Sequence, residues 1–169
     1  MKIGINVKLA IAAGLINCIA WYIIARSLNY YSFNVEQYRY YVTLLLLLIG
    51  IPVSIFYERK HNNGFIEFKD ALKCGVLYSI VLSFSIALFS YTYYKFIVPD
   101  AISFFVSEAK KSMIESKVKE GDIPKNIELV ISYFGSFRVF MSTLIIGLLM
   151  SLAASAILRK KNLQAFHAN

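Results

Sequence analysis

Four long apolar stretches, separated by charged connections, dominate this 169-residue chain. They lie at Val7–Leu28, Tyr41–Tyr57, Cys74–Val98 and Ile131–Leu158. About 20 mainly apolar residues are enough for a helix to cross the hydrocarbon core of a bilayer, so four such stretches argue against a soluble fold. The sequence therefore predicts an all-α, polytopic integral membrane protein with four transmembrane helices. They form one domain over residues 1–161, and a short C-terminal tail follows at 162–169.

The basic residues indicate which ends of these helices face the cytoplasm. Three segments hold nine basic and three acidic residues, a net charge of +6: the N-terminal flank, the second connection and the segment after the fourth stretch. The basic residues are Lys2, Lys8, Arg59, Lys60, Lys69, Lys73, Arg159, Lys160 and Lys161. In the first and third connections the charges cancel; in the first, Arg39 balances Glu36. Because Lys and Arg in short loops stay in the cytoplasm, the predicted topology is N-in/C-in.

The second connection has the pattern of an amphipathic segment. Phe65, Phe68 and Leu72 recur at helical spacing among charged residues, after a turn signal at Asn62-Asn63-Gly64. This pattern predicts a segment that lies at the inner membrane interface and offers a docking surface.

The third connection, at 99–130, also carries an amphipathic pattern. A helix is predicted to begin after Pro99-Asp100 and to end near Gly121, and Ile123-Pro124 is expected to break the chain before the fourth span. This outer helix either caps the bundle or docks a partner.

Small residues indicate how the spans pack. The third stretch has Ser79, Ser83 and Ala87 at intervals of four, and the fourth has Gly147, Ser151 and Ser155 at the same interval. Such stripes let helices approach closely in lipid, either within one bundle or between copies in a homo-oligomer. The second stretch lacks a stripe and is expected to face lipid broadly. Pro52 is expected to kink or end its helix.

Tyrosines and basic residues gather at the predicted outer face. Nine of the twelve tyrosines fall there: Tyr30, Tyr31, Tyr38, Tyr40, Tyr41, Tyr91, Tyr93, Tyr94 and Tyr133. They form either an interfacial anchoring belt or a ring-lined groove for a lipid or sugar. Four basic residues share this level: Arg26, Arg39, Lys95 and Arg138. They either snorkel to the headgroups or converge into a ring that clamps an anionic headgroup.

The sequence shows no pattern of catalytic or metal-binding chemistry. No acidic residue lies inside the four stretches, and the chain has no HExxH, GxSxG or Gly-rich phosphate loop. The Cys and His residues, which are Cys18, Cys74, His61 and His167, lack ligand spacing. No enzyme activity, metal or cofactor is therefore predicted. A nucleic-acid partner is not expected either, because no soluble basic face is present.

Three segments resemble, in order, a bacterial membrane family known as domain of unknown function 4199. They read GFIEFKDALKCG at 64–75, YYKFIVPD at 93–100 and AILRKK at 156–161, and the resemblance extends over residues 5–161. It implies a multi-pass protein of the bacterial inner membrane, from the Bacteroidota. It implies no particular activity and no catalytic residues.

Two functional hypotheses follow. The first is a non-enzymatic accessory or scaffold subunit, with a membrane or peripheral protein partner that docks on Phe65, Phe68 and Leu72 or on the outer helix. The second is a protein that binds or moves a phospholipid or polyprenyl-phosphate headgroup at the four basic residues. An intramembrane enzyme ranks last, because no acid, base and nucleophile point to one.

Overall fold

A computed structural model describes residues 4–160, apart from the side chain of Phe33. The predictions that concern Lys2, Lys161, His167 and the tail at 162–169 lie outside these residues. Six α-helices occupy the described part of the chain: α1 (Ile5–Leu28), α2 (Phe33–His61), α3 (Phe68–Thr92), α4 (Ala101–Glu115), α5 (Ile123–Tyr133) and α6 (Ser136–Leu158). A π-helical turn, η1 (Tyr93–Ile97), continues α3, and a short 3-10 turn, η2 (Glu120–Asp122), precedes α5.

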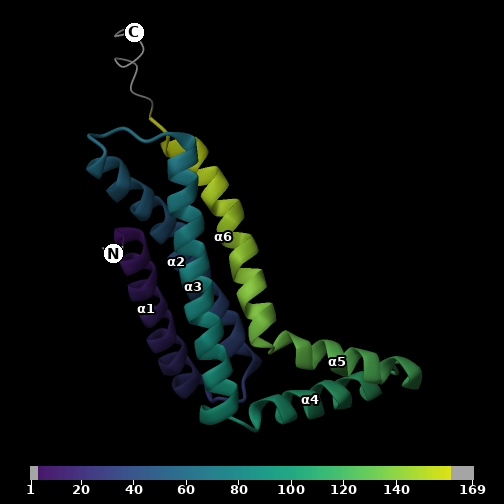
Figure 1. Ribbon diagram of the computed structural model, residues 1–169. Helices are drawn as coiled ribbons and strands as arrows, with labels where there is room; N and C mark the ends of the chain where they lie inside the picture. The colour runs from purple at the N-terminus through teal and green to yellow at the C-terminus, as the bar shows by residue number, and fades with distance from the viewer. Residues whose placement is uncertain (1–3, 161–169) are drawn as a thin grey trace.

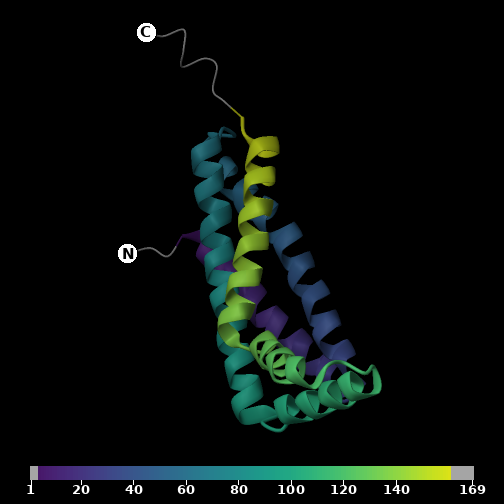
Figure 2. The ribbon, with the colours of Figure 1, turned by 90° about the vertical axis from the view of Figure 1, so that its right-hand side faces the viewer.

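Four of these helices are long and apolar enough to cross a membrane: α1, α2, α3 with η1, and α6. They pack against one another as a bundle, and α4 and α5 extend sideways from one end of it (Figures 1 and 2). The prediction of an all-α polytopic membrane protein is confirmed. We call the end that carries α4 and α5 the hairpin end. The α2–α3 connection and the end of α6 lie together at the opposite end (Figure 1).

The stripes of small residues on α3 and α6 pack against each other within the chain. The hydroxyls of Ser79 and Ser151 lie 3.4 Å apart. A Cβ at Gly147 would lie 2.6 Å from the Cβ of Ser79, and one at Gly75 would lie 2.8 Å from the Cβ of Ser151. A Cβ at either position would clash with the facing serine. The two glycines therefore allow the backbones of α3 and α6 to approach closely.

Helix α2 is longer than the predicted span at 41–57. It begins at Phe33, where the Ser32 hydroxyl accepts a hydrogen bond from the Asn34 backbone N–H (3.3 Å), and it continues past Pro52 to His61. Proline therefore does not end this helix. Helix α2 approaches α3 closely at Gly50, although it has no stripe of small residues. The Tyr78 hydroxyl of α3 lies where a side chain at Gly50 would begin.

The amphipathic segment of the second connection is partly the beginning of α3. Phe68 and Leu72 lie in the first turns of that helix, and Phe65 precedes it. Ile66 forms two backbone hydrogen bonds with Lys160, of 3.0 and 2.9 Å, which tie the start of α3 to the end of α6.

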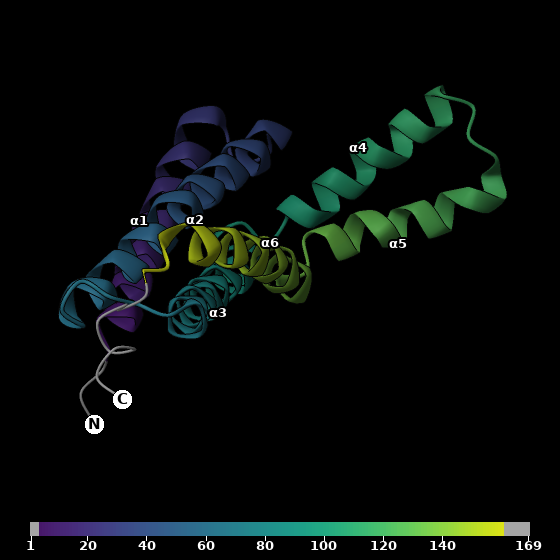
Figure 3. The same cartoon turned by 90° about the horizontal axis from the view of Figure 1, so that it is seen from above.

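The third connection contains two helices rather than one. Helix α4 ends at Glu115 instead of near Gly121, because Lys117 takes a left-handed conformation (φ 54°) and the Val118 N–H turns back to the Met113 carbonyl (3.0 Å). Ile123-Pro124 begins α5 rather than breaking the chain, since proline fits the first turn of a helix. The fourth span consequently begins at Ser136. Helices α4 and α5 run side by side as a hairpin (Figure 3).

Candidate functional site at the hairpin end

A buried ion pair lies near the start of α2. The Arg39 guanidinium lies 2.7 Å from Glu36 Oε2 through Nη2, and its Nε–H donates to the same oxygen at 3.0 Å. Glu36 is 6 % exposed and Arg39 is 8 % exposed. One helical turn separates the two residues, so the helix itself brings them together. The pairing is what allows both charges to be buried in a membrane-spanning segment.

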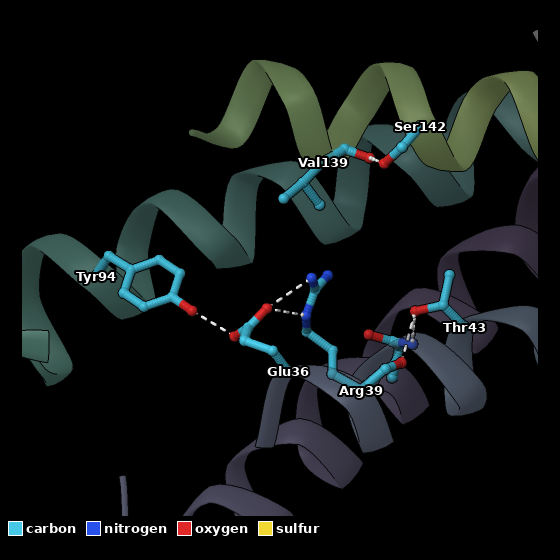
Figure 4. A network of polar contacts seen from close by, with 7 residues as sticks. Glu36, Arg39, Thr43, Tyr94, Val139 and Ser142 are labelled. Carbon is cyan, nitrogen blue, oxygen red and sulfur yellow. Dashed lines mark hydrogen bonds and ion pairs between the residues drawn. The ribbon is translucent and has the colours of Figure 1, made fainter. Parts of the chain in front are cut away.

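Two aromatic side chains from other helices contact the pair. The Tyr94 hydroxyl, from η1, donates a hydrogen bond to Glu36 Oε1 (Figure 4). The Trp21 ring, from α1, lies 4.7 Å from the guanidinium carbon of Arg39. A cation above an aromatic face is stabilised by the ring quadrupole, and more so where water is excluded. Side chains from three spanning segments, α1, α2 and α3 with η1, therefore meet at this charge pair.

The polar contacts continue one turn further along α2. The Thr43 hydroxyl donates to the Arg39 backbone carbonyl at 3.0 Å (Figure 4). The same hydroxyl accepts a hydrogen bond from the Asn17 side chain at 2.9 Å. Both side chains are buried. The bond between Asn17 and Thr43 joins α1 to α2 one turn from Arg39.

A cleft of about 570 Å³ lies beside the ion pair, between the start of α2 and the corner where α5 meets α6. It is lined by Glu36, Gln37, Tyr40, Leu129, Val130, Tyr133, Phe134 and Arg138. Phe134 anchors this corner, because it is buried and stacks on Phe105 of α4 with 4.9 Å between ring centroids. The cleft thus combines an apolar wall with a carboxylate and a guanidinium.

Of the four predicted basic residues, Arg138 alone lines this cleft. It is exposed, its guanidinium lies 5.1 Å from the Tyr133 ring centre, and its Nη1 donates to the Ser132 hydroxyl at 3.3 Å. Arg39 is buried in the ion pair instead of facing the surface. Lys95 lies over the Tyr91 ring at 5.0 Å, and Arg26 is in the last turn of α1. The four residues therefore do not form one ring around the cleft.

The sequence interpretation missed Glu36 as a buried acid in the first turn of α2. It placed Glu36 and Arg39 in a connection, because charged residues commonly mark the end of a span. Their spacing of three residues was the available signal, since a pair at that distance can neutralise itself on a helix. Tyr93 and Tyr94 were placed in the tyrosine belt, but both are buried, because η1 turns them into the bundle.

The predicted docking residues lie at the opposite end. Phe65 and Leu72 are half-buried, and Phe68 is 37 % exposed. The Lys160 ammonium lies 5.8 Å from the Phe65 ring centre. Among residues 4–160, no group of three or more His, Cys, Asp and Glu side chains is arranged to hold a metal ion.

The family model described as "Protein of unknown function (DUF4199)" matches residues 8–160. The chain belongs to the DUF4199 family. The match runs from α1 to Lys160, just after the end of α6. All four spans, the hairpin and the cleft therefore belong to the DUF4199 region. No curated protein and no solved structure matches the chain.

Proposed function

We propose that this DUF4199 protein binds a membrane lipid, with the lipid headgroup in the cleft at the hairpin end, and that it carries out no chemical step. The proposal places the protein in the inner membrane of a bacterium of the Bacteroidota, with both termini in the cytoplasm. In that topology the hairpin end faces outward. The positive charge of the opposite end supports this orientation.

The observation that carries the proposal is the pairing of an apolar wall with one exposed cation in the same cleft. Leu129, Val130 and Phe134 offer an apolar surface of the kind that an acyl chain covers. Arg138 stands at the start of α6, where a span meets the headgroup region. A guanidinium has five N–H donors, and one hydrogen bond of Arg138 is to Ser132, so donors remain for a phosphate.

Replacing Arg138 with Leu is expected to reduce the amount of phospholipid that stays with the purified protein by about tenfold, because a charge-assisted hydrogen bond is lost. Native mass spectrometry after extraction in a mild detergent measures the retained lipid. Arg26→Leu is the matched control, since Arg26 is also exposed and lies near the end of a span but does not line the cleft. Equal lipid retention in wild type and in both variants would contradict the proposal.

A second candidate function, that of an accessory subunit, is favoured by the hairpin itself. Helices α4 and α5 extend away from the bundle (Figure 3) and expose Phe104, Ile114 and Leu129, each between 39 % and 58 %. Apolar side chains on a projecting element can pack against an apolar helix of a membrane partner. The same purification tests this function. A stoichiometric second protein that is lost from a Phe104→Ser/Ile114→Ser variant would support it, and recovery of the chain alone would argue against it.

A further inference from the structure

We infer that the cleft selects a zwitterionic phospholipid whose headgroup carries a primary ammonium group. This inference rests on the proposed function. The phosphate binds Arg138, and the ammonium binds Glu36. The inference depends on how the two charges are placed in the cleft, on the acceptor capacity of Glu36 and on the aromatic rings beside it.

The two charged groups line the cleft from different helices. Glu36 belongs to α2 and Arg138 to α6, and both line the same space. Arg39 pairs with Glu36 on the side away from the cleft. Arg39 does not line the cleft, and its guanidinium lies over the Trp21 ring. The ion pair is therefore a dipole whose negative end faces the cleft. A ligand with one positive and one negative group matches this arrangement, because each group meets a charge of opposite sign.

Glu36 has room for one more hydrogen-bond donor. A carboxylate offers about four acceptor positions. Three are occupied: Oε2 accepts from Nε and Nη2 of Arg39, and Oε1 accepts from the Tyr94 hydroxyl. The remaining position, on Oε1, suits one N–H of an ammonium group. Tyr94 and Arg39 hold the carboxylate still, so a ligand would find this acceptor already oriented.

Other headgroups fit the two charges less well. A phospholipid whose headgroup is anionic satisfies Arg138 but places no cation against Glu36. A choline headgroup has the positive charge but no N–H to donate. The rings of Tyr40 and Tyr133 also line the cleft, and rings of this kind bind quaternary ammonium groups. Stepwise methylation of the ammonium therefore separates recognition by Glu36 from recognition by the rings.

The test uses the full-length wild-type protein and four phospholipids with identical acyl chains: phosphatidylethanolamine, its N-monomethyl form, phosphatidylcholine and phosphatidylglycerol. Native mass spectrometry of the protein with equimolar mixtures measures relative binding. Phosphatidylethanolamine is expected to bind at least about tenfold more tightly than phosphatidylcholine or phosphatidylglycerol. Choline has no N–H to donate to Glu36, and the glycerol hydroxyls can donate but carry no positive charge, so neither forms the charge-assisted hydrogen bond. Equal or tighter binding of phosphatidylcholine, or tighter binding of phosphatidylglycerol, would overturn the inference.

A paired variant isolates the carboxylate without leaving an unpaired buried charge. Glu36→Gln combined with Arg39→Met removes both charges, and it is expected to abolish the preference for phosphatidylethanolamine while Arg138 still retains phospholipid. Asp70→Asn combined with Lys73→Met is the control, because it removes an exposed ion pair at the opposite end. A preference that survives in the Glu36/Arg39 variant would overturn the inference.

The two levels of the proposal fail in different ways. If every phospholipid binds through Arg138 without headgroup preference, the ammonium assignment is wrong and the lipid site stands. If no phospholipid depends on Arg138, the proposed function itself is wrong.

Discussion

Replacing Glu36 alone with Gln is expected to lower the free energy of unfolding by about 3–5 kcal/mol, because Arg39 then keeps a buried charge without its counterion. Arg39 is 8 % exposed, and its guanidinium is enclosed by Trp21 and the Glu36 carboxylate. Equilibrium unfolding in mixed detergent micelles, followed by far-UV circular dichroism, measures the change. Glu36→Gln combined with Arg39→Met is expected to recover most of the loss, since no unpaired charge remains.

The exposed ion pair of the same chain provides the comparison. The Lys73 ammonium lies 3.2 Å from Asp70 Oδ1. The side chain of Lys73 is 67 % exposed and that of Asp70 is 52 % exposed. Asp70→Asn is expected to change stability by about 0–1 kcal/mol, because water already solvates both groups. If Glu36→Gln were as mild as Asp70→Asn, or if the paired variant were no more stable than the single one, the ion pair would not be the organising contact of the hairpin end.

Replacing Gly147 with Ala is expected to destabilise the bundle by about 1–3 kcal/mol through overpacking. The new Cβ would lie 2.6 Å from the Cβ of Ser79, and that atom is fixed by the backbone of α3. Helices α3 and α6 must then move apart. The same unfolding measurement applies.

Two further variants make this result specific. Gly121→Ala is the control, because a Cβ there would meet nothing within 4 Å. Ser79→Gly in the Gly147→Ala background removes the clashing atom and is expected to restore part of the stability. A Gly147→Ala protein as stable as wild type would show that α3 and α6 are not in close contact at this point.

The sequence was sufficient for the features that depend on local pattern. The four spans follow from run length, and each small-residue stripe follows from its four-residue spacing, but that spacing does not say which stripe packs against which. The contact of Ser79 with Gly147 is known only from the fold. The boundary between α5 and α6 was less accessible. Residues 131–133 (Ile-Ser-Tyr) carry no charge, and the chain turns only at Phe134-Gly135, so a continuous uncharged stretch hides the boundary between the two helices.

The candidate site depends on contacts that no local pattern contains. Tyr94 reaches Glu36 across 58 positions of sequence, and the cleft is lined together by the start of α2, the end of α5 and the start of α6. The sequence singled out the basic residues, but their partners decide their surroundings: Arg39 forms a buried ion pair with Glu36, whereas Arg138 lies at the surface of the cleft. Charge counts cannot separate these two cases, and the fold can.

The most direct test of the lipid site is photo-crosslinking in native membranes. A photoreactive phenylalanine replaces Leu129, which lines the cleft, or Leu149, which is 62 % exposed on α6 outside it. After irradiation and detergent washing, mass spectrometry identifies the lipid bound to each position. The lipid-site account predicts adducts of one phospholipid class at Leu129 that are lost with Arg138→Leu, and adducts that follow bulk membrane composition at Leu149. The same bulk mixture at both positions, unaffected by Arg138→Leu, would contradict it.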